Sequence, residues 1–354
     1  MSKIKVLVVD DSALMRKKIK EMLETDSEIE VTGIARNGED CITKAKELNP
    51  DVITLDVNMP IMDGITALKI LVEEEICPVI MVSSLTQKDA EITFEALEIG
   101  AFDFVPKPGG TISLNIDQIR DDLIRKVKAA VKGKFKTLKR KVDKTKRSIV
   151  KSRFFKKSDP KLGFKAVCIG ISTGGPKTIF DVLPHLPKDI NAAIFLVQHM
   201  PPGFTASFAK RLDNYCEIKV KEAEAGDIVE PGICYLGKGG YHLTIFQRLN
   251  KNIVLRLPNK PEHLFKPSVD VMMDSVANTF QSDTIGVLMT GMGDDGADGM
   301  VKIKKLGGYT IAESEETAIV FGMPAEAIKR GGADIVLPSY EIAGEIIRAL
   351  EQGC

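Results

Sequence analysis

Short apolar runs alternate with segments of helical period along most of this 354-residue chain. A short apolar run bounded by polar residues is typical of a buried strand, and apolar residues every three or four positions are typical of a helix. Strands that alternate with helices predict βαβ units, and therefore parallel sheets covered by helices. Residues 1–124 accommodate five strands and five helices. The predicted strands of this segment are residues 3–9, 31–35, 52–55, 79–83 and 102–105.

The same alternation resumes near residue 164 and predicts a second domain of the same class. We expect strands near 165–171, 192–198, 233–236, 285–290, 309–313 and 334–337. We expect helices over 176–185, 203–215, 268–280, 295–306, 324–330 and 341–351, with a β-hairpin over 241–257. The predicted fold class is therefore α/β, with two doubly wound parallel-sheet domains.

Charged residues divide the chain into three segments, although its formal net charge is zero. Residues 1–124 hold 13 Lys/Arg and 24 Asp/Glu, whereas residues 125–161 hold 17 Lys/Arg and 2 Asp/Glu. Because such breaks mark boundaries, we predict a first domain at 1–124, a basic linker at 125–161 and a second domain at 162–354. The start of the linker could continue the last helix of the first domain. Its charge is compatible with solubility, with docking on the acidic first domain or with contact to nucleic acid.

The N-terminal sequence and the cysteines indicate a compartment. The first apolar run turns acidic at Asp10 and Asp11, and no apolar stretch approaches the roughly 18 residues of a transmembrane helix. The six cysteines are scattered without a C-x-x-C pair, which is typical of reduced thiols in protein cores. We therefore expect a cytoplasmic protein that does not insert into membranes.

Polar side chains follow four of the strands predicted in the first domain. Asp10 and Asp11 follow the first strand, Asp56 ends the third, Ser83 ends the fourth and Lys107 follows the fifth. In a doubly wound sheet, functional groups gather at the carboxyl edge of the strands. Clustered carboxylates repel one another unless a cation lies between them, and hard oxygen ligands suit Mg²⁺. This edge is therefore predicted to bind Mg²⁺, which would neutralise charge on a phosphoryl group arriving at one carboxylate.

These motifs make residues 1–124 resemble the receiver domains of response regulators, which have a flavodoxin-like fold. The resemblance rests on Asp-Asp at 10–11, D-x-N-M-P at 56–60, M-V-S-S at 81–84 and Lys-Pro at 107–108. It implies that Asp56 is the phosphoacceptor. It implies a Mg²⁺ site formed by Asp10, Asp11, Asp56 and the backbone of Asn58. It also implies a switch hydroxyl, a switch aromatic residue and a phosphate-sensing lysine at Ser83, Phe104 and Lys107.

The stretch G-I-S-T-G-G at residues 170–175 lies between a predicted strand and a predicted helix. Glycines in this position can cradle a phosphate, because N–H groups at a helix N-terminus attract anions. The same residues contain G-x-S-x-G, a pattern that presents a nucleophilic serine, here Ser172. The spacing within this stretch does not distinguish a phosphate-binding loop from a nucleophile.

A nucleophilic serine needs a histidine that acts as its base. His199 follows the strand predicted at 192–198, the next strand after the one that precedes Ser172. Parallel strands end at the same edge of a sheet, and adjacent strands are about 5 Å apart. We therefore expect His199 and Ser172 to face each other at that edge. The other histidines are weaker candidates. His185 and His263 are expected to be structural or surface residues, and His242 could line a cleft.

An acid that orients the histidine is expected after the strand predicted at 285–290. Asp294 and Asp295 lie at the carboxyl end of that strand, immediately before another predicted helix. One of them is expected to be the N-cap of that helix, which leaves the other free to accept the N–H of His199. The chain order serine, histidine, aspartate differs from that of the α/β-hydrolases, so the G-x-S-x-G match alone does not indicate that fold.

Together, these motifs make residues 164–354 resemble the catalytic domain of the chemotaxis protein-glutamate methylesterases, a Rossmann-like domain. GISTGGP, QHMPPGF, KPSVDVMMDSVA, TGMGDDGADGM and GMPAEAI occur in the order found in that family. The resemblance implies a catalytic triad of Ser172, His199 and Asp295, with Asp294 as a helix cap or a bystander. It also implies that backbone N–H groups at Thr173 and Met292 stabilise an oxyanion.

Two departures from the family pattern lie on loops predicted to be near the site. Lys238, within G-K-G-G at 237–240, stands where the family usually has a proline. Phe265 and Lys266 precede Pro-Ser-Val-Asp, where an arginine is common. Both departures bear on substrate contacts rather than on the chemistry.

The resemblance implies a phosphorylation-activated hydrolase that cleaves glutamate methyl esters on chemoreceptors and so provides chemotaxis adaptation. It implies methyl-accepting chemoreceptors as substrates and a chemotaxis histidine kinase as the phosphodonor. It implies Mg²⁺ in the receiver domain and no cofactor for the esterase. The family often also deamidates receptor glutamines by the same attack on an amide.

Three other functions are compatible with parts of the sequence. A phosphorylation-controlled DNA-binding regulator would use the basic linker, but the second domain is acidic and lacks helix-turn-helix spacing. A nucleotide-binding domain would use residues 170–175, but G-x-x-x-G-G matches neither the P-loop nor the dinucleotide fingerprint. A catalytically inactive docking module is disfavoured by the intact serine, histidine and aspartate. We therefore expect no nucleic-acid partner.

Overall fold

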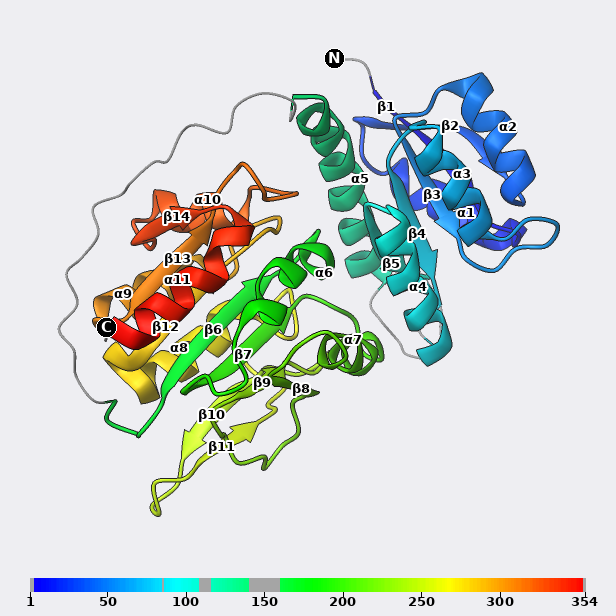
Figure 1. Ribbon diagram of the computed structural model, residues 1–354. Helices are drawn as coiled ribbons and strands as arrows, with labels where there is room; N and C mark the ends of the chain where they lie inside the picture. The colour runs from blue at the N-terminus through cyan, green and yellow to red at the C-terminus, as the bar shows by residue number, and fades with distance from the viewer. Residues whose placement is uncertain (1–2, 85, 108–115, 140–159, 353–354) are drawn as a thin grey trace. The chain divides into compact units, whose positions relative to one another are not determined.

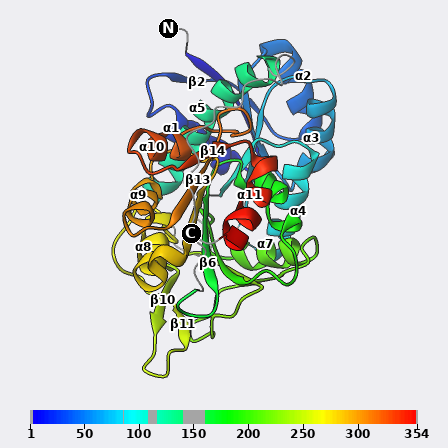
Figure 2. The same ribbon diagram turned by 60° about the vertical axis from the view of Figure 1, so that its left-hand side comes forward.

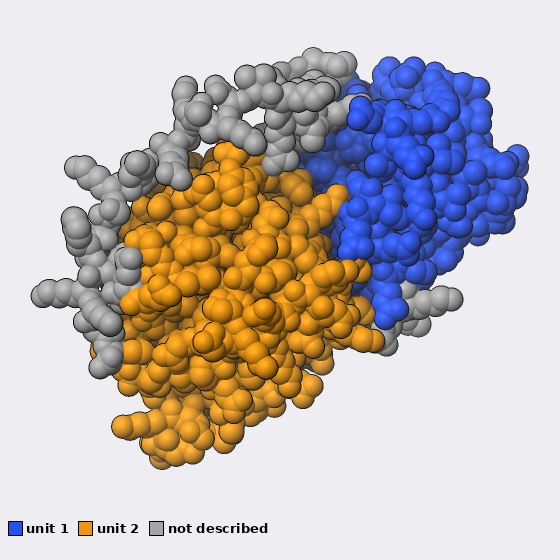
Figure 3. All heavy atoms as spheres, viewed as in Figure 1, with its two compact units in different colours: residues 1–145 blue, residues 146–354 orange. Residues whose placement is uncertain are grey.

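The computed structural model describes residues 3–84, 86–107, 116–139 and 160–352, so residues 140–159 of the predicted linker lie outside the described residues. The chain divides into two compact units, residues 1–145 and 146–354 (Figure 3). Each unit is built on a parallel sheet with helices between its strands (Figure 1). The α/β class predicted from the alternation of strands and helices is confirmed.

The first unit contains a five-stranded parallel sheet in the order β2-β1-β3-β4-β5, which is the flavodoxin-like order. Its strands are β1 (Ile4–Val9), β2 (Ile29–Ala35), β3 (Val52–Asp56), β4 (Val79–Ser83) and β5 (Asp103–Pro106). Its helices are α1 (Ala13–Leu23), α2 (Gly38–Leu48), α3 (Gly64–Glu73), α4 (Gln87–Ile99) and α5 (Ile116–Lys139). β3 and β4 are buried along their whole length, as expected for strands covered on both faces.

Local sequence sets where four of these helices begin. Ser12, Asn37, Asp63 and Thr86 each accept a hydrogen bond from the backbone N–H three residues ahead, as N-cap residues do. Each such cap stabilises a helix by about 1 kcal/mol. Because these helices follow the carboxyl ends of strands, the same caps hold the loops at that edge of the sheet.

Helix α5 runs to Lys139, beyond the boundary predicted at residue 124. That boundary falls inside the helix, so the first part of the predicted basic linker is helical. Lys126 links the helix to β5. Its ammonium donates to the carbonyl oxygen of Phe104 at 2.6 Å and lies 3.3 Å from Oδ1 of Asp103. The break in charge does not mark the end of the helix, since basic residues can occupy the exposed face of an amphipathic helix.

The second unit contains a seven-stranded parallel sheet in the order β14-β13-β12-β6-β7-β9-β8. Its strands are β6 (Lys165–Ile171), β7 (Ala192–Gln198), β8 (Lys219–Glu222), β9 (Ile233–Leu236), β12 (Thr284–Leu288), β13 (Tyr309–Glu313) and β14 (Ile335–Leu337). Its longer helices are α7 (Phe204–Asp213), α8 (Val269–Phe280), α9 (Ala297–Lys305), α10 (Met323–Lys329) and α11 (Ser339–Gln352). Figure 2 shows α8, α9 and α10 on one side of this sheet and α7 and α11 on the other. This is the doubly wound arrangement predicted for the second domain.

Two local features of the second unit differ from the prediction. Strand β8 is not predicted, because only Val220 of its four residues is buried at this edge of the sheet. The helix predicted at 176–185 is instead α6 (Gly175–Thr178) followed by two 3₁₀ turns, η1 (Ile179–Asp181) and η2 (Leu183–His185). Pro184 explains the interruption, since proline lacks an N–H and disfavours helical conformation in the residue before it.

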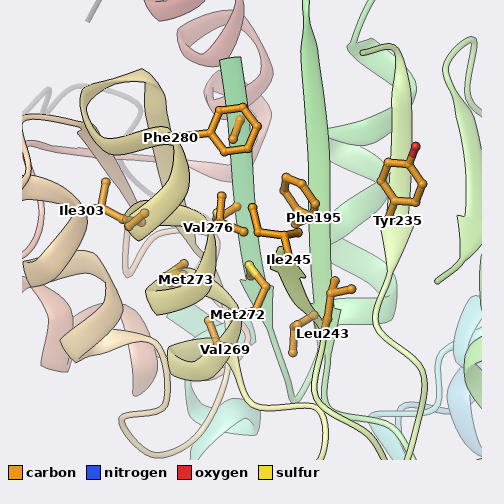
Figure 4. Packing of buried hydrophobic residues seen from close by; sticks show 14 of the residues in the cluster. Phe195, Tyr235, Leu243, Ile245, Val269, Met272, Met273, Val276, Phe280 and Ile303 are labelled. Carbon is orange, nitrogen blue, oxygen red and sulfur yellow. The ribbon is translucent and has the colours of Figure 1, made fainter. Parts of the chain in front are cut away.

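Helix α8 and the antiparallel hairpin of β10 (Thr244–Gln247) and β11 (Ile253–Arg256) close one side of the core of the second unit. The hairpin falls inside the range predicted for it. Figure 4 shows Phe195 of the sheet between Tyr235 and apolar side chains of α8, among them Met272 and Phe280. Burying a side chain of this size contributes about 1.5–3 kcal/mol. This packing holds α8 against the sheet and fixes the position of its first turn.

Strand β6 is the point at which the chain changes direction across the second sheet. From β6 the chain adds β7 and β9 on one side, and it later returns to add β12 and β13 on the other side. In open α/β sheets, ligands bind at the carboxyl ends of strands beside such a change of direction. We therefore expect a binding or catalytic site at the loops after β6, β7 and β12.

Candidate functional site

Three side chains from adjacent strand ends meet in the second unit. Ser172 follows β6, His199 follows β7 and Asp295 lies in the loop between β12 and α9. The Nδ1 atom of His199 lies 3.1 Å from the hydroxyl oxygen of Ser172, and its Nε2 atom lies 2.7 Å from Oδ2 of Asp295. The sheet register produces this arrangement, because Ile171 pairs with Gln198 directly before the serine and the histidine. The structure thus brings together the three side chains that the sequence singles out.

The two hydrogen bonds define the role of each imidazole nitrogen. A carboxylate accepts hydrogen bonds and cannot donate them, so Nε2 of His199 carries the proton and donates to Asp295. Nδ1 is then free to accept the hydroxyl proton of Ser172. Burial would raise the pKa of Asp295, but His199 and the N–H groups of Asp270 and Val269 hold that pKa well below its usual range. Asp295 is therefore a carboxylate near neutral pH and can stabilise a positive charge on His199.

The first turn of α8 holds the carboxylate of Asp295 in place. Its oxygens accept hydrogen bonds from the hydroxyl of Ser268 at 2.8 Å and from the N–H groups of Val269 at 2.7 Å and Asp270 at 3.0 Å. The N-terminus of a helix favours negative charge. The position of Ser268 directly before a helix is an N-cap signal in the sequence, but it does not reveal this contact with Asp295.

Neither Asp294 nor Asp295 caps the helix that follows, which corrects the prediction. α9 begins after Gly296, whose φ is +97° and which makes no side-chain cap hydrogen bond. Asp295 instead serves the N-terminus of α8, a helix that precedes it in the chain. Asp294 is exposed and pairs with Arg330, so it takes no part in the contacts of Ser172 and its partners.

Residues of neighbouring strands fix the loop that carries Ser172. The N–H of Ser172 donates to the carbonyl oxygen of Thr290 at 2.9 Å, and its own carbonyl oxygen accepts from Nε2 of Gln198 at 3.0 Å. The hydroxyl of Thr290 donates to the carbonyl oxygen of Thr173 at 2.9 Å, and its N–H donates to Oε2 of Glu313 at 2.7 Å. Glu313 is fully buried at the end of β13. These supporting residues were not predicted from the sequence, although a polar residue at the end of an apolar strand is the signal that could reveal them.

Two backbone N–H groups beside Ser172 are available to negative charge. Within the described ranges, the N–H groups of Thr173 and Met292 donate to no other group of the protein. Met292 follows Gly291, where an added Cβ atom would lie within 2.8 Å of the Cβ atom of Ser172. The missing side chain at Gly291 therefore lets the loop after β12 approach the serine closely.

The other histidines have different surroundings. His185 is exposed in η2, as expected. His242 is fully buried, accepts the N–H of Ser268 at 3.3 Å and contacts the carbonyl oxygen of Pro261 at 2.8 Å; burial lowers its pKa. His263 lies nearer the site than predicted, because its Nε2 atom is 3.8 Å from Oδ1 of Asp295. This contact joins loops far apart in sequence, so no local pattern reveals it.

The departures at Lys238, Phe265 and Lys266 differ in how close they come to the triad. Lys238 pairs with Glu222 at 3.6 Å, and Lys266 pairs with Glu262 at 2.8 Å. Such pairs at the surface contribute little to stability. Phe265, in contrast, stacks on the imidazole of His199.

Carboxylates from two strand ends also meet in the first unit. Oxygen atoms of Asp10, Asp11 and Asp56 lie within 4.8 Å of one another. The ammonium of Lys107, directly after β5, lies 3.0 Å from Oδ2 of Asp10 and 2.8 Å from Oδ2 of Asp56. Asp10 and Asp56 are buried, whereas Asp11 is exposed. The cluster therefore reaches the surface at Asp11.

The charges in this cluster favour a further cation. Burial, opposed by Lys107 and reinforced by Asp10, raises the pKa of Asp56 to about 6. Burial lowers the pKa of Lys107, but its hydrogen bonds to Asp56 and Asp10 outweigh burial and raise that pKa overall. The cluster holds three carboxylates, and Lys107 pairs with only two of them, Asp10 and Asp56. Hard oxygen ligands suit Mg²⁺. Asp10, Asp11 and Asp56 therefore fit a bound Mg²⁺ ion.

The candidate switch residues of the first unit contact one helix. The hydroxyl of Thr93 donates to the Ser83 hydroxyl oxygen at 2.9 Å, and the ring of Phe104 is buried edge-on against Phe94, with centroids 6.4 Å apart. The side chain of Asn58 donates to Oδ1 of Asp89 at 3.0 Å. The three partners all lie on α4. Helix α4 is thus linked to the end of β4, to β5 and to the loop after β3.

Both units match known protein families. The model of the response regulator receiver domain matches residues 6–116, and the model of the CheB methylesterase domain matches residues 167–346. The chain belongs to the CheB methylesterase family. In this CheB-family chain the receiver domain comes first and the methylesterase domain second, as the sequence motifs indicate.

Relatives of this CheB-family chain are similar to it over their whole length. Protein-glutamate methylesterase/protein-glutamine glutaminase 3 of Syntrophomonas wolfei is 58% identical over 354 residues, covering 99% of this chain and 100% of the relative. The protein-glutamate methylesterase/protein-glutamine glutaminase of Caldanaerobacter subterraneus is 50% identical over 363 residues, covering 99% and 97%. The crystal structure of the Thermotoga maritima CheB methylesterase catalytic domain shares 46% identity and a TM-score of 0.51, covering 52% of this chain and 98% of that chain.

These similarities define the class of the protein. It is a hydrolase of the methylesterase family that carries a response-regulator receiver domain, which indicates phosphorylation-regulated chemotaxis adaptation. A receiver domain implies Mg²⁺ binding, and the cluster of carboxylates in the first unit fits that requirement. Among the helices that the structure describes, none is long and apolar enough to cross a bilayer.

Proposed function

We propose that this protein hydrolyses glutamate methyl esters on methyl-accepting chemoreceptors through a serine nucleophile, and that phosphorylation of Asp56 activates it. The observation that carries the proposal is the imidazole of His199, which contacts the hydroxyl of Ser172 at 3.1 Å and the carboxylate of Asp295 at 2.7 Å. The names of the relatives support the ester substrate.

In the first half of the reaction, the Ser172 oxygen attacks the ester carbonyl while Nδ1 of His199 takes the hydroxyl proton. Asp295 accepts the Nε2–H and stabilises the imidazolium that forms. The N–H groups of Thr173 and Met292 are proposed to bind the oxyanion, which is often the largest contribution of such sites. The proton on Nδ1 then passes to the departing methoxy oxygen, and methanol leaves.

In the second half, water hydrolyses the acyl-enzyme. Nδ1 of His199 takes a proton from the water, whose oxygen attacks the acyl carbon, and the same proton returns to the Ser172 oxygen as the glutamate is released. No metal ion or cofactor is needed in these steps, because the three side chains and two N–H groups supply nucleophile, base and charge stabilisation. Attack on a glutamine amide would follow the same course with ammonia as the leaving group, as the glutaminase part of the relatives' names suggests.

The receiver is proposed to take its phosphoryl group on Asp56 from a chemotaxis histidine kinase. Asp10, Asp11, Asp56 and the backbone of Asn58 would hold Mg²⁺, which neutralises charge on the incoming phosphoryl group. Lys107, 2.8 Å from Asp56, would contact the phosphoryl oxygens. Ser83 and Phe104 would respond to the new charge and pass the change to α4, which contacts both residues.

Removal of Mg²⁺ is expected to slow phosphorylation of Asp56 at least about 100-fold, since a bound metal supplies several kcal/mol of stabilisation at a phosphoryl group. The measurement is transfer of labelled phosphate from a small acyl phosphate, with EDTA or with added Mg²⁺. Asp56→Asn should abolish labelling, while Asp63→Asn, at an exposed cap that asparagine can also form, should leave it unchanged. Labelling of Asp56→Asn at the wild-type rate would contradict the assignment.

We propose that the unphosphorylated receiver restricts access to the triad and that phosphorylation relieves the restriction, so that a bistable element gates the reaction. The proposed division is a receiver at 1–124, a basic linker at 125–161 whose first part continues α5 of the receiver to Lys139, and a methylesterase domain at 162–354. Since methylated sites of chemoreceptors lie on their cytoplasmic helices, the reaction is proposed to occur in the cytoplasm.

Deletion of the receiver is expected to raise basal methanol release at least about 10-fold, because minor states of such equilibria are typically populated at roughly 0.1–10%. The cut belongs after residue 145 rather than after residue 124, since a cut at 124 would divide α5. The full chain treated with a phosphodonor is the matched comparison. A truncated protein no faster than the untreated full chain would overturn the inhibitory role of the receiver.

Nucleic-acid binding is the alternative that the basic segment from residue 125 raises. A salt-dependent shift of DNA in a gel would support it, since phosphate contacts weaken as salt rises. The family of the second domain favours the esterase, so we expect no shift at moderate salt.

A further inference from the structure

We propose that Phe265 is a positioning residue for His199, and that its ring stabilises the imidazolium that His199 becomes when it takes the serine proton. The inference rests on the proposed triad of Ser172, His199 and Asp295. It assigns a role to a residue that departs from the pattern of the family.

The two rings form a close, nearly parallel stack. The centroids of the His199 and Phe265 rings are 4.1 Å apart, and their planes differ by 11°. The hydrogen bonds of His199 to Ser172 and Asp295 lie in the plane of the imidazole and set its direction within that plane. The phenyl ring covers one face and resists tilting of the imidazole out of that plane. In-plane bonds and the stack together define the orientation of the base.

The backbone on both sides of Phe265 is held by the protein. The N–H of Phe265 donates to Nδ1 of His263 at 3.2 Å, and the carbonyl oxygen of Lys266 accepts from the N–H of Gly240 at 2.9 Å. Because Nδ1 of His263 accepts this bond, its Nε2 carries the proton in the neutral ring and faces Asp295, 3.8 Å away. The phenyl ring is therefore set against His199 by fixed neighbours.

The stack gains stability when His199 becomes charged. The face of a phenyl ring carries partial negative charge and attracts a cation, whereas two neutral rings in a parallel arrangement gain less. His199 is neutral before the serine attacks and positive afterwards, so the attraction grows along the reaction. An interaction that is stronger in the transition state than in the ground state raises kcat rather than lowering KM.

The test is a series of fluorinated phenylalanines placed at position 265 of the full-length, phosphorylated protein. Fluorine atoms withdraw charge from the ring face and change its size little. Methanol release from methylated receptor membranes is expected to fall stepwise from mono- to trifluorophenylalanine, reaching about 3- to 30-fold in kcat. KM and the midpoint of thermal unfolding are expected to stay constant. The same series at Phe246, which is 43% exposed on β10, is the control and should leave kcat unchanged.

Two substitutions complete the test. Phe265→Leu should lower kcat about 10-fold, and Phe265→Tyr, which keeps the ring face, should restore most of it. A flat fluorine series, or a leucine variant with wild-type kcat, would overturn the proposal. A rise in KM with constant kcat would overturn it as well, because the ring would then contact substrate rather than position the base. Ser172→Ala in the same assay distinguishes failure of the proposed triad from failure of the role proposed for Phe265. If the Ser172→Ala variant still hydrolyses ester, the proposed triad is wrong, whatever the fluorine series shows.

Discussion

Ser172→Ala is expected to lower methanol release from methylated receptors at least about 10⁴-fold while leaving phosphorylation of Asp56 at the wild-type rate. Loss of a serine nucleophile removes the covalent route altogether, and such losses commonly reach about 10⁶-fold in kcat. Alanine retains the Cβ atom, and the contacts of the loop are made by the backbone of Ser172, so the fold should persist.

The measurement is methanol release by the phosphorylated protein, with labelling by a phosphodonor measured in parallel. Ser282→Ala is the matched control, because Ser282 lies in η3 (Gln281–Asp283) before β12, at the opposite edge of the sheet from the triad. Hydrolysis by Ser172→Ala within about tenfold of the wild type would reject a serine nucleophile. Equal loss of phosphorylation would indicate a folding defect instead.

Asp295→Asn is expected to lower kcat about 10⁴-fold, comparable with loss of the acid in other serine triads. Asparagine would donate to Nε2 of His199 and so place the ring proton on Nδ1, which faces Ser172 at 3.1 Å. A protonated Nδ1 cannot accept the serine proton. The imidazolium would also lose the carboxylate that stabilises it.

Asp294→Asn is the control for this substitution, since it makes the same chemical change at the neighbouring position. Asp294 is exposed and pairs with Arg330, so its variant should keep kcat within about twofold and change stability by less than ~1 kcal/mol. An Asp295→Asn variant that keeps kcat would remove Asp295 from the mechanism. Asp295 also accepts hydrogen bonds from the first turn of α8, so the thermal unfolding of the Asp295→Asn variant should be measured alongside its kcat.

The order of strands and helices follows from local sequence because most elements carry their own signals. Caps such as Asn37 and Asp63 mark helix starts, and the fully apolar runs at β6 and β7 mark strands buried on both faces. The exceptions have local or edge causes. Strand β8 buries only one residue, and Pro184 divides the helix expected at 176–185.

The hydrogen bonds that hold the site residues in place are harder to predict from the sequence than the order of strands and helices. The aspartate pair after β12 suggests a cap for α9, yet Asp295 accepts hydrogen bonds from α8. Ser268 donates to Asp295, and Gln198 donates to the carbonyl oxygen of Ser172. Glu313 accepts the N–H of Thr290 in the neighbouring loop. Each contact depends on which loops the sheet order places side by side, and that order involves pairing over more than 100 residues, as between β6 and β12.

The amino-acid sequence alone was enough to predict the class of fold, the two strand-end clusters, the candidate nucleophile and base, and the aspartate pair that supplies the acid. It could do so because parallel strands carry the residues at their carboxyl ends to one common edge, whatever the sheet order. The folded structure was needed to show which nitrogen of His199 faces Ser172, which helix Asp295 serves, and that Phe265 covers the imidazole. Those outcomes depend on the packing of α8 and its preceding loop against β6 and β7, a long-range arrangement that no local spacing encodes.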